Sequence, residues 1–509
     1  MSDSTEYDGG GADVVVVGGG SAGAVLAARL SEDPGRTVLL LEAGPDYGPG
    51  RFPNGLLSPY VLADPDHDWG YTARATDHAE SIAAPRGRTI GGSSAVNAGV
   101  AIRARAADFA AWETRYGIKG WSYDEVLPTF KAMENTPTGD DAFHGRTGPF
   151  PIRQWTYEEL TSPLRAFVDG WAARGFRRID DYNGAEQAGT GGYPVNIVAG
   201  VRQNTAMVYL TPEVRRRPNL RVLGDVTADT VLIGGGRARG VVSASGTTYP
   251  AGEVVLAAGA YGSPSILLRS GIGPAEDLRA LDIGVIADLP VGQRLQDHPF
   301  FPAVYALSPD HQTMTAAFIA HLWFASQDAE PGELDMSVVS THLPEAPFSP
   351  TGGAILLATA VTRPQSRGSL TLAGPNPHDA PVIDNNYLST PADRRRMLAG
   401  VKLVRDLAAT APFSDVVAGE LVPGDAVRSD DELEAAIAAG IATYGHPTST
   451  VPMGGPADEW AVVDELGAVR GLTGLRVVDS SIIPEAPSTV TNATTVMIAE
   501  HLARRLYGR

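Results

Sequence analysis

Cysteine is absent from the 509 residues of this chain. Its absence excludes disulfide bonds, thiolate metal ligands and a cysteine nucleophile, and we expect no metal site. The chain also lacks a run of the roughly 18 apolar residues that a membrane-spanning helix needs. Its start, residues 1–11, is polar and acidic, without the basic and apolar regions of a signal peptide. We therefore expect a cytoplasmic protein with no membrane span.

Positive charge is also scarce in this chain. Its 40 lysines and arginines are outnumbered by 59 aspartates and glutamates, which gives a formal net charge of −19. This balance argues against nucleic acid or an anionic membrane as a partner, and a solvated acidic surface is its ordinary explanation. The length predicts two to four domains with a substantial core.

The first recognisable motif joins a strand to a helix near the N-terminus. Residues 14–17 are four valines, which is typical of a strand buried on both faces in a parallel sheet. Gly18, Gly20 and Gly23 follow with the spacing G-x-G-x-x-G. These glycines allow a tight turn, a close approach to a pyrophosphate and close packing of the helix on the strand. The motif predicts a dinucleotide site at the helix N-terminus.

Glu42 indicates which dinucleotide is bound. Residues 37–41 are predicted as the second strand, and Glu42 stands at its carboxyl end, 19 positions after Gly23. A carboxylate at this place suits a ribose 2′-hydroxyl and repels a 2′-phosphate, which favours FAD or NAD over NADP. The alternative is an ordinary βαβ unit with no ligand.

Two more stretches rich in small residues predict close contact between backbone and a ligand. Residues 86–99 contain adjacent glycines followed by serines, and Asn97 offers both a donor and an acceptor. Strands predicted at 220–223, 226–233 and 240–243 lead to a buried strand at 253–257. A second glycine-containing turn follows, with Pro264 expected at the start of a helix over 265–270.

Taken with the C-terminal region, these blocks resemble the glucose–methanol–choline (GMC) oxidoreductases, a family of FAD-dependent enzymes. The resemblance rests on residues 18–42, 87–97, 259–273 and 443–495, in that order, and with the linking segments covers nearly the whole chain. It implies an α/β (α+β overall) fold in which a Rossmann-like FAD-binding domain is interrupted by a substrate domain of antiparallel sheet plus helices. The expected FAD-binding domain comprises 1–151, 195–299 and 442–509, and the expected substrate domain comprises 152–194 and 300–441.

The resemblance also implies the residues that contact FAD. Val226 falls where the family places a backbone contact to the adenine, and Asp479 with Ser480 matches the segment that reaches the ribityl chain and pyrophosphate. Members with a histidine-linked flavin carry that histidine just before the loop asparagine, where this chain has Val96, so we expect noncovalent FAD. The full expected set is Gly18, Gly20, Ser21, Ala22, Gly23, Glu42, Ala43, Arg88, Gly91, Gly92, Ser93, Asn97, Ala98, Gly99, Val226, Ala258, Gly259, Ser263, Asp479, Ser480, Asn492 and Thr494.

His446 is the candidate catalytic base. It precedes a proline, which disfavours helical geometry, and an imidazole in such a loop is suited to take a proton. A lone histidine of this kind is usually structural. In the GMC family, however, a histidine and a second His or Asn meet at the reacting face of the flavin. His446 and Asn492 fall on these two positions, although Thr491 or Asn492 also suits the N-cap of a helix over 493–506.

The resemblance then implies oxidation of an alcohol to an aldehyde or ketone. His446 accepts the hydroxyl proton, Asn492 holds the oxygen, and the carbon delivers hydride to flavin N5, with O2 or another acceptor reoxidising the flavin. We expect Tyr444 and Trp323 in the substrate pocket, and less directly Phe324 and His342. The chain departs from common family motifs at Ser449, Val490 and Thr494, which puts substrate shape in doubt more than reaction type.

The sequence leaves other functions open. Some relatives cleave cyanohydrins as hydroxynitrile lyases and use FAD only structurally. The family's light-driven decarboxylases are a weaker rival, because their active site resembles one that uses a cysteine, and this chain has no cysteine. A flavoprotein without turnover is disfavoured by the filled catalytic positions, and a nicotinamide-dependent dehydrogenase by the distant blocks.

Overall fold

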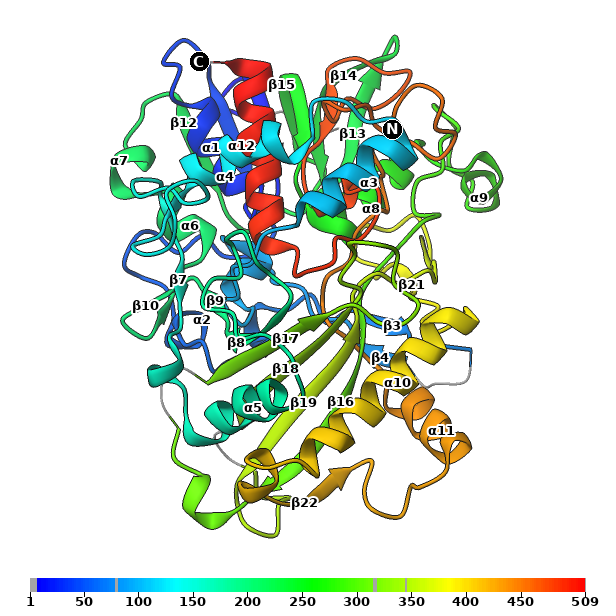
Figure 1. The fold of residues 1–509 in the computed structure, drawn as a ribbon. Coiled ribbons are helices and arrows are strands. Elements are labelled where there is room, and N and C mark those ends of the chain that lie inside the picture. Colours follow the sequence, from blue (N-terminus) through cyan, green and yellow to red (C-terminus); the bar gives the residue numbers. More distant parts are fainter. Residues whose placement is uncertain (1–6, 78–80, 315–317, 344–345, 509) are drawn as a thin grey trace.

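A computed structural model describes residues 7–77, 81–314, 318–343 and 346–508 of the chain. Two large sheets dominate the molecule (Figure 1), one in its upper half and one in its lower half. The upper half holds both the N-terminal strands and the C-terminal helix, so the two ends of the chain are folded into the same half. Among these described residues, no helix is long and apolar enough to cross a membrane.

The valine-rich first strand lies at the centre of a parallel sheet. β1 (Ala12–Val17) pairs in parallel with β2 (Val38–Leu41) and with β15 (Thr248–Leu256). β12 (Leu220–Leu223) and β24 (Leu475–Val477) extend it in the order β12-β2-β1-β15-β24. Helix α1 (Gly23–Leu30) packs on β1 and β2, and α12 (Asn492–Tyr507) packs against α1. The predicted strand–glycine turn–helix unit is therefore confirmed.

A hairpin continues from β15 at one side of this sheet. β14 (Arg237–Ser243) pairs antiparallel with the start of β15, and β13 (Ala228–Gly234) pairs antiparallel with β14. The sequence predicted these two strands at 240–243 and 226–233, so the hairpin exists with shifted ends. Its turn lies at Gly235 and Gly236, which both have positive φ angles.

The helix after β15 differs from the prediction. α8 runs over Gly259–Arg269, so it begins six positions before residue 265 and contains Pro264 in its interior. A proline there removes the amide that would donate to the Ala260 carbonyl. The Thr450 hydroxyl donates to that carbonyl at 2.8 Å instead. A side chain remote in sequence thus compensates for the proline, which local sequence reasoning could not foresee.

The second large sheet is antiparallel and has helices on one face. β16 (Pro299–Leu307), β19 (Ala354–Val361), β18 (Met336–Leu343) and β17 (Ile319–Phe324) are its central strands, in that spatial order. β22 (Val417–Val422) and β8 (Gly189–Gly192) form its edges, and β23 (Ala442–Thr443) pairs with β16. Helices α5 (Ser162–Ala173) and α10 (Pro391–Ala408) cover one face, as Figure 1 shows, and α11 (Asp430–Gly440) packs on α10.

Smaller elements connect the two sheets. A four-stranded sheet has the order β20 (Ser369–Thr371), β21 (Val382–Asp384), β3 (Thr72–Arg74) and β4 (Ser81–Ala83). Two-stranded pairs join β5 (Glu134–Asn135) to β6 (Phe150–Pro151), β7 (Arg153–Gln154) to β9 (Pro194–Val195), and β10 (Ile197–Val198) to β11 (Val201–Arg202). The remaining helices are α2 (Asn54–Leu57), α3 (Ala106–Tyr116), α4 (Tyr123–Met133), α6 (Thr205–Tyr209), α7 (Pro212–Arg215) and α9 (Ala275–Ala280).

Each large sheet has its own hydrophobic core. One core surrounds β1, β2, β15 and α12, and the other lies between the antiparallel sheet and its helices. A buried ion-pair network joins them, because Arg363, just after β19, pairs with Asp108 on α3 at 2.7 Å and also with Glu485 before α12. These ion pairs connect the antiparallel-sheet half of the molecule to the half that contains the parallel sheet.

Candidate active site

A cavity of about 490 Å³ lies between the parallel and the antiparallel sheet. It meets the carboxyl ends of β1, β2 and β15, the edge at which α/β sheets bind ligands. Most residues predicted from the sequence line it: Gly18, Gly20, Ser21, Ala22, Glu42, Ala43, Gly92, Ser93, Asn97, Ala98, Val226, Ala258, Gly259, Tyr444, His446, Asp479, Ser480 and Asn492. The other predicted residues do not line it: Gly23, Arg88, Gly91, Gly99, Ser263, Thr494 and Trp323.

Several residues outside the cavity wall have clear structural contacts. Ser263 donates to the Asp479 carboxylate at 2.6 Å and so helps to hold that side chain at the cavity. Thr494 accepts the amide of Ala104 at 3.1 Å. Trp323 is 0% exposed and belongs to the second core, so its predicted place in the substrate pocket is not what the structure shows. The two weaker expectations, Phe324 and His342, also do not line the cavity.

The glycine turn forms a cradle that side chains would fill. Gly18 has a φ of +98°, and a Cβ there would lie 2.6 Å from the Ala257 carbonyl oxygen. A Cβ on Gly23 would lie 1.7 Å from the Gly18 oxygen, so only glycine lets α1 approach the turn. A Cβ on Gly92 would lie 2.6 Å from the Gly20 Cα. This arrangement keeps the N-terminus of α1 open to a pyrophosphate, and the residues present therefore fit a dinucleotide.

Glu42 holds two backbone amides at the end of β2. Its carboxylate accepts from the Gly19 amide at 2.7 Å and from the Gly44 amide at 2.8 Å. Burial raises the pKa of Glu42 to about 7, against the opposing effect of these hydrogen bonds. The side chain thus fixes the glycine turn while its carboxylate faces the cavity.

Asn492 contacts the glycine turn and not the predicted base. The Ser21 hydroxyl donates to Asn492 Oδ1 at 2.7 Å, across 471 positions of sequence. The Asn492 Nδ2 atom is buried and has no hydrogen-bond partner among the described residues. Of the two predicted N-cap candidates, Thr491 is the N-cap of α12, and Asn492 is the first residue of the helix. No hydrogen bond joins Asn492 to His446 in the described part of the chain.

His446 lies in the cavity wall against a second histidine. Its Nδ1 is 3.0 Å from Nδ1 of His298, and its backbone amide donates to Asp297 Oδ1 at 2.7 Å. The Tyr444 ring lies 4.6 Å away, centroid to centroid. Burial lowers the pKa of His446 well below its ordinary value, and His298 and the Arg86 guanidinium lower it further. The imidazole is therefore neutral at pH 7 and able to accept a proton.

Known proteins share this organisation. GMC oxidoreductase family models match residues 12–300 and 364–499. The chain belongs to the GMC oxidoreductase family. It is 35% identical to the oxygen-dependent choline dehydrogenase of Rhizobium etli (strain CIAT 652), over 98% of this chain and 96% of that protein. The crystal structure of pyridoxine 4-oxidase from Mesorbium loti is similar with a TM-score of 0.89 and 34% identity, over 97% of this chain and 99% of that one.

Membership in the GMC family confirms three predictions. The Rossmann-like fold is confirmed, FAD is the cofactor, and the protein is an FAD-dependent oxidoreductase of the class that acts on alcohols. Another relative, the oxygen-dependent choline dehydrogenase of Burkholderia lata, is 36% identical over 98% of this chain and 94% of its own length. The acceptor, the site residues and the domain boundaries remain predictions.

Two residues that contact His446 in this GMC oxidoreductase, Asp297 and His298, were not predicted from the sequence. Asp297 accepts hydrogen bonds from the amides of His298 and His446 and from the hydroxyls of Thr443 and Tyr387. His298 is fully buried, and burial lowers its pKa as well. One sequence signal could have found it, because His298 precedes a proline just as His446 does.

The antiparallel sheet supplies the opposite wall of the cavity. Ile319 on β17, Val339 on β18, and Leu356 and Ala358 on β19 line it, with Phe300 at the start of β16. The alternation along β19 directs Thr359 to the other face, where a Cβ on Gly400 of α10 would lie 2.6 Å from its methyl group. This wall is therefore mainly apolar, in contrast to the polar backbone of the glycine turns.

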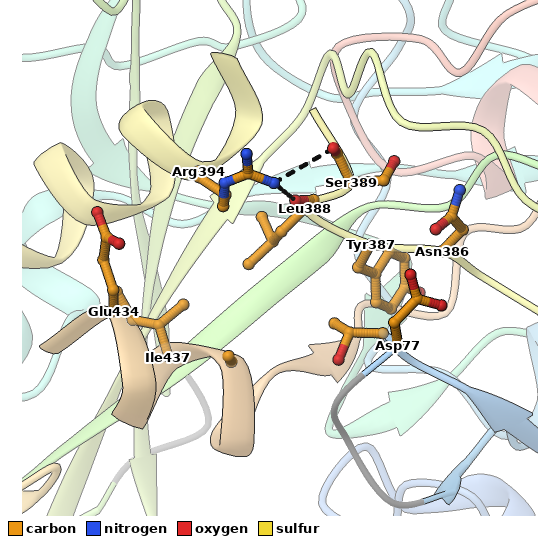
Figure 2. A pocket seen from close by; sticks show the side chains of 10 residues that line it. Asp77, Asn386, Tyr387, Leu388, Ser389, Arg394, Glu434 and Ile437 are labelled. Carbon is orange, nitrogen blue, oxygen red and sulfur yellow. Dashed lines mark hydrogen bonds between the residues drawn. The ribbon is translucent and has the colours of Figure 1, made fainter. Parts of the chain in front are cut away.

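A second, separate pocket of about 340 Å³ lies near the first turn of α10. Figure 2 shows Arg394 directed at the carbonyls of Leu388 and Ser389, to which it donates at 2.8 and 3.2 Å. Tyr387 lines the same pocket and donates to Asp297 Oδ2 at 2.6 Å. Asp297, which accepts the amide of His446, is therefore hydrogen-bonded to a residue in the wall of this second pocket.

Proposed function

We propose that this protein oxidises a CH–OH substrate to an aldehyde or ketone with His446 as the general base. The observation that carries the proposal is a neutral, half-buried imidazole in the wall of a cavity that also contains a dinucleotide cradle. FAD, when bound, supplies the two-electron acceptor for the hydrogen on carbon. The relatives named choline dehydrogenase and pyridoxine 4-oxidase support an alcohol as the substrate.

His446 needs a free lone pair to act as this base. The 3.0 Å contact between the two Nδ1 atoms requires one histidine to donate and the other to accept. We assign the donor to His446, because this tautomer leaves its Nε2 unprotonated and available for the hydroxyl proton. His298 then accepts at Nδ1 and fixes the orientation of the His446 ring. General-base assistance of this kind contributes about 10²–10⁴-fold to a rate.

Asn492 is assigned to cofactor binding in this proposal. Its contact with Ser21 places the amide at the glycine turn, and its unpartnered Nδ2 can donate to the cofactor. The side chain of Val96 supports noncovalent binding, because a valine in the cavity wall offers no atom for a covalent bond. Acid precipitation is expected to release the yellow cofactor into the supernatant, and yellow protein in the pellet would contradict this.

Anaerobic reduction of the flavin tests the assignment of the base. A panel of primary and secondary alcohols is mixed with the holoenzyme, and the loss of flavin absorbance is followed. His446→Ala is expected to slow reduction about 10²–10⁴-fold at unchanged FAD content. His378→Ala, at an exposed histidine, is the matched control and is expected to react like the parent.

Three outcomes separate the rival functions. Undiminished reduction in His446→Ala would reject the proposed base. Cyanohydrin cleavage without loss of flavin absorbance by any alcohol would indicate a hydroxynitrile lyase. Peroxide formation in air after reduction would identify O2 as the acceptor, whereas slow reoxidation in air would favour another electron acceptor.

A further inference from the structure

We infer that the substrate of this protein is a neutral, largely apolar alcohol and not a quaternary ammonium alcohol such as choline. This inference rests on the proposed function and names the substrate class of the same site. It separates the protein from the choline dehydrogenases that are 35–36% identical to it. The apolar surface of the sheet wall and the placement of the charged groups around the cavity favour such a substrate.

The sheet wall forms a continuous apolar surface. Ile319 pairs with Thr341 and Thr341 pairs with Leu356, so these three residues form one row across β17, β18 and β19. Val339 and Ala358 form the next row. All five line the cavity, and the Thr341 hydroxyl is the one polar side-chain group among them. A hydrocarbon group of a substrate would be desolvated favourably against this wall.

The carboxylates of the cavity lie at its cofactor end. Three of its described lining residues are acidic: Glu42, Asp379 and Asp479. Glu42 binds the glycine turn, and Asp479 accepts the amide of Gly259 at 2.9 Å at the start of α8. Asp379 lies in the segment between β20 and β21, and β20 packs on α8. Among its described residues, the sheet wall therefore has no carboxylate to pair with a cationic substrate.

A positively charged side chain of the cavity wall lies beside the proposed base. Arg86 lines the cavity and donates to the Gly445 carbonyl at 2.9 Å, next to His446. Asp297 lies behind the wall, where it is 3% exposed and accepts four hydrogen bonds. An ammonium group in this place would meet repulsion from the guanidinium and no accessible anion.

Aromatic rings do not replace the missing anion. Phe300, Tyr444 and Tyr193 line the cavity, and aromatic faces attract ammonium groups. The Phe300 and Tyr444 rings, however, lie 5.5 Å apart and pack against each other. A cation between them would need to separate the rings, and one beside them would lose its hydration without an ion partner. The same rings provide a favourable surface for a neutral aryl or alkyl group.

Pairs of alcohols that differ only in charge test the inference. Choline and 3,3-dimethylbutan-1-ol have nearly the same shape, as do the trimethylammonium and tert-butyl derivatives of benzyl alcohol. We expect the neutral member to have a kcat/KM for flavin reduction at least about tenfold higher. Where neither member of a pair reacts, both are tested as competitive inhibitors of the oxidation of the best alcohol of the panel. The neutral member is again expected to bind more tightly.

Val339→Asp adds a carboxylate to the sheet wall with little change in size. This variant is expected to raise the kcat/KM of the charged alcohol relative to that of its neutral partner about tenfold or more. The matched control Val339→Asn is expected to keep the parental ratio. If Val339→Asp does not fold, the comparison in the parental enzyme decides alone. A charged alcohol that reacts or binds as well as its neutral partner would overturn the inference and leave the proposed function intact. Failure of every alcohol to reduce the flavin would overturn both.

Discussion

His446 and His298 share one hydrogen bond between Nδ1 atoms 3.0 Å apart, and this contact decides which nitrogen can act as a base. His298 is buried and His446 is half-buried, and both have lowered pKa values, so neither is charged at pH 7. Asp297 holds the backbone amides of both residues through its Oδ1 atom. In the proposed mechanism His298 is thus a positioning residue, because it would act on the substrate through His446.

The His298 contact predicts a change in pH dependence. In the parental enzyme, kcat/KM is expected to fall only well below pH 6.5, because His446 must be neutral and its pKa is lowered. His298→Ala removes one cause of that lowering, so the acid limb is expected to move to higher pH and kcat to fall about tenfold or more.

His298→Asn is the conservative control for this prediction. Its amide oxygen can accept from His446 Nδ1, so it is expected to restore part of kcat, whereas the acid limb stays at the shifted pH because an amide carries no charge. The measurement is anaerobic flavin reduction between pH 4.5 and 8. A loss of kcat in His298→Ala with an unshifted acid limb would show that His298 is only structural.

At the scale of elements, α8 depends on a contact from a distant loop. Pro264 removes a helical amide, and the Thr450 hydroxyl donates to the unpaired Ala260 carbonyl at 2.8 Å. The amide of Gly292 in turn donates to the Thr450 carbonyl at 2.7 Å. Helix α8, which begins at the cavity with Gly259, is therefore positioned from the same loop that carries His446.

Thr450→Val is expected to destabilise the protein by about 1–3 kcal/mol, because it leaves a buried carbonyl without a donor. The side chains have similar shape, so packing changes little. Urea unfolding of the holoenzyme measures the effect. Thr473→Val, at an exposed position, is the control and is expected to stay within about 0.5 kcal/mol of the parent. Equal stability of the two variants would reject the role of Thr450.

At the scale of the whole molecule, two cores meet across one cavity. Arg363 and its carboxylate partners connect the antiparallel sheet to α3 and to the loop before α12. The predicted FAD-binding and substrate domains correspond broadly to these cores, and their boundaries stay a prediction. The core of the antiparallel sheet also contains a buried neutral histidine, His321, which links the stability of the molecule to pH.

Burial lowers the pKa of His321 to about 3, whereas an unfolded histidine has a pKa of about 6.5. Between these values the unfolded state binds the extra proton, so stability falls as the pH falls from about 6.5 toward 3. His321→Phe keeps the stacking position on Tyr193 and is expected to reduce this acid dependence by up to about 1.4 kcal/mol per pH unit.

Urea unfolding at pH 6.5, 5.5 and 4.5 measures the acid dependence of stability. His378→Phe serves as the exposed control and is expected to keep the parental slope. An unchanged slope in His321→Phe would show that this histidine gains its proton in the folded protein.

The sequence alone determined the cofactor cradle and the family. The residues of the first βαβ unit are neighbours along the chain, so Gly18, Gly20, Gly23 and Glu42 could be interpreted from spacing. His446 was found because a family motif surrounds it. The predicted helix over 493–506 was also close to α12, because its periodicity is local.

The tertiary structure decided which of these residues work together. Asn492 contacts Ser21 across 471 positions, and His446 contacts His298 across 148. Trp323 lies four residues beyond Ile319 on the same face of β17, where the second core buries it, and the sequence does not show which part of this face meets the cavity. Short-range backbone geometry leaves its pattern in neighbouring residues, whereas contacts between distant segments depend on how the two sheets pack against each other.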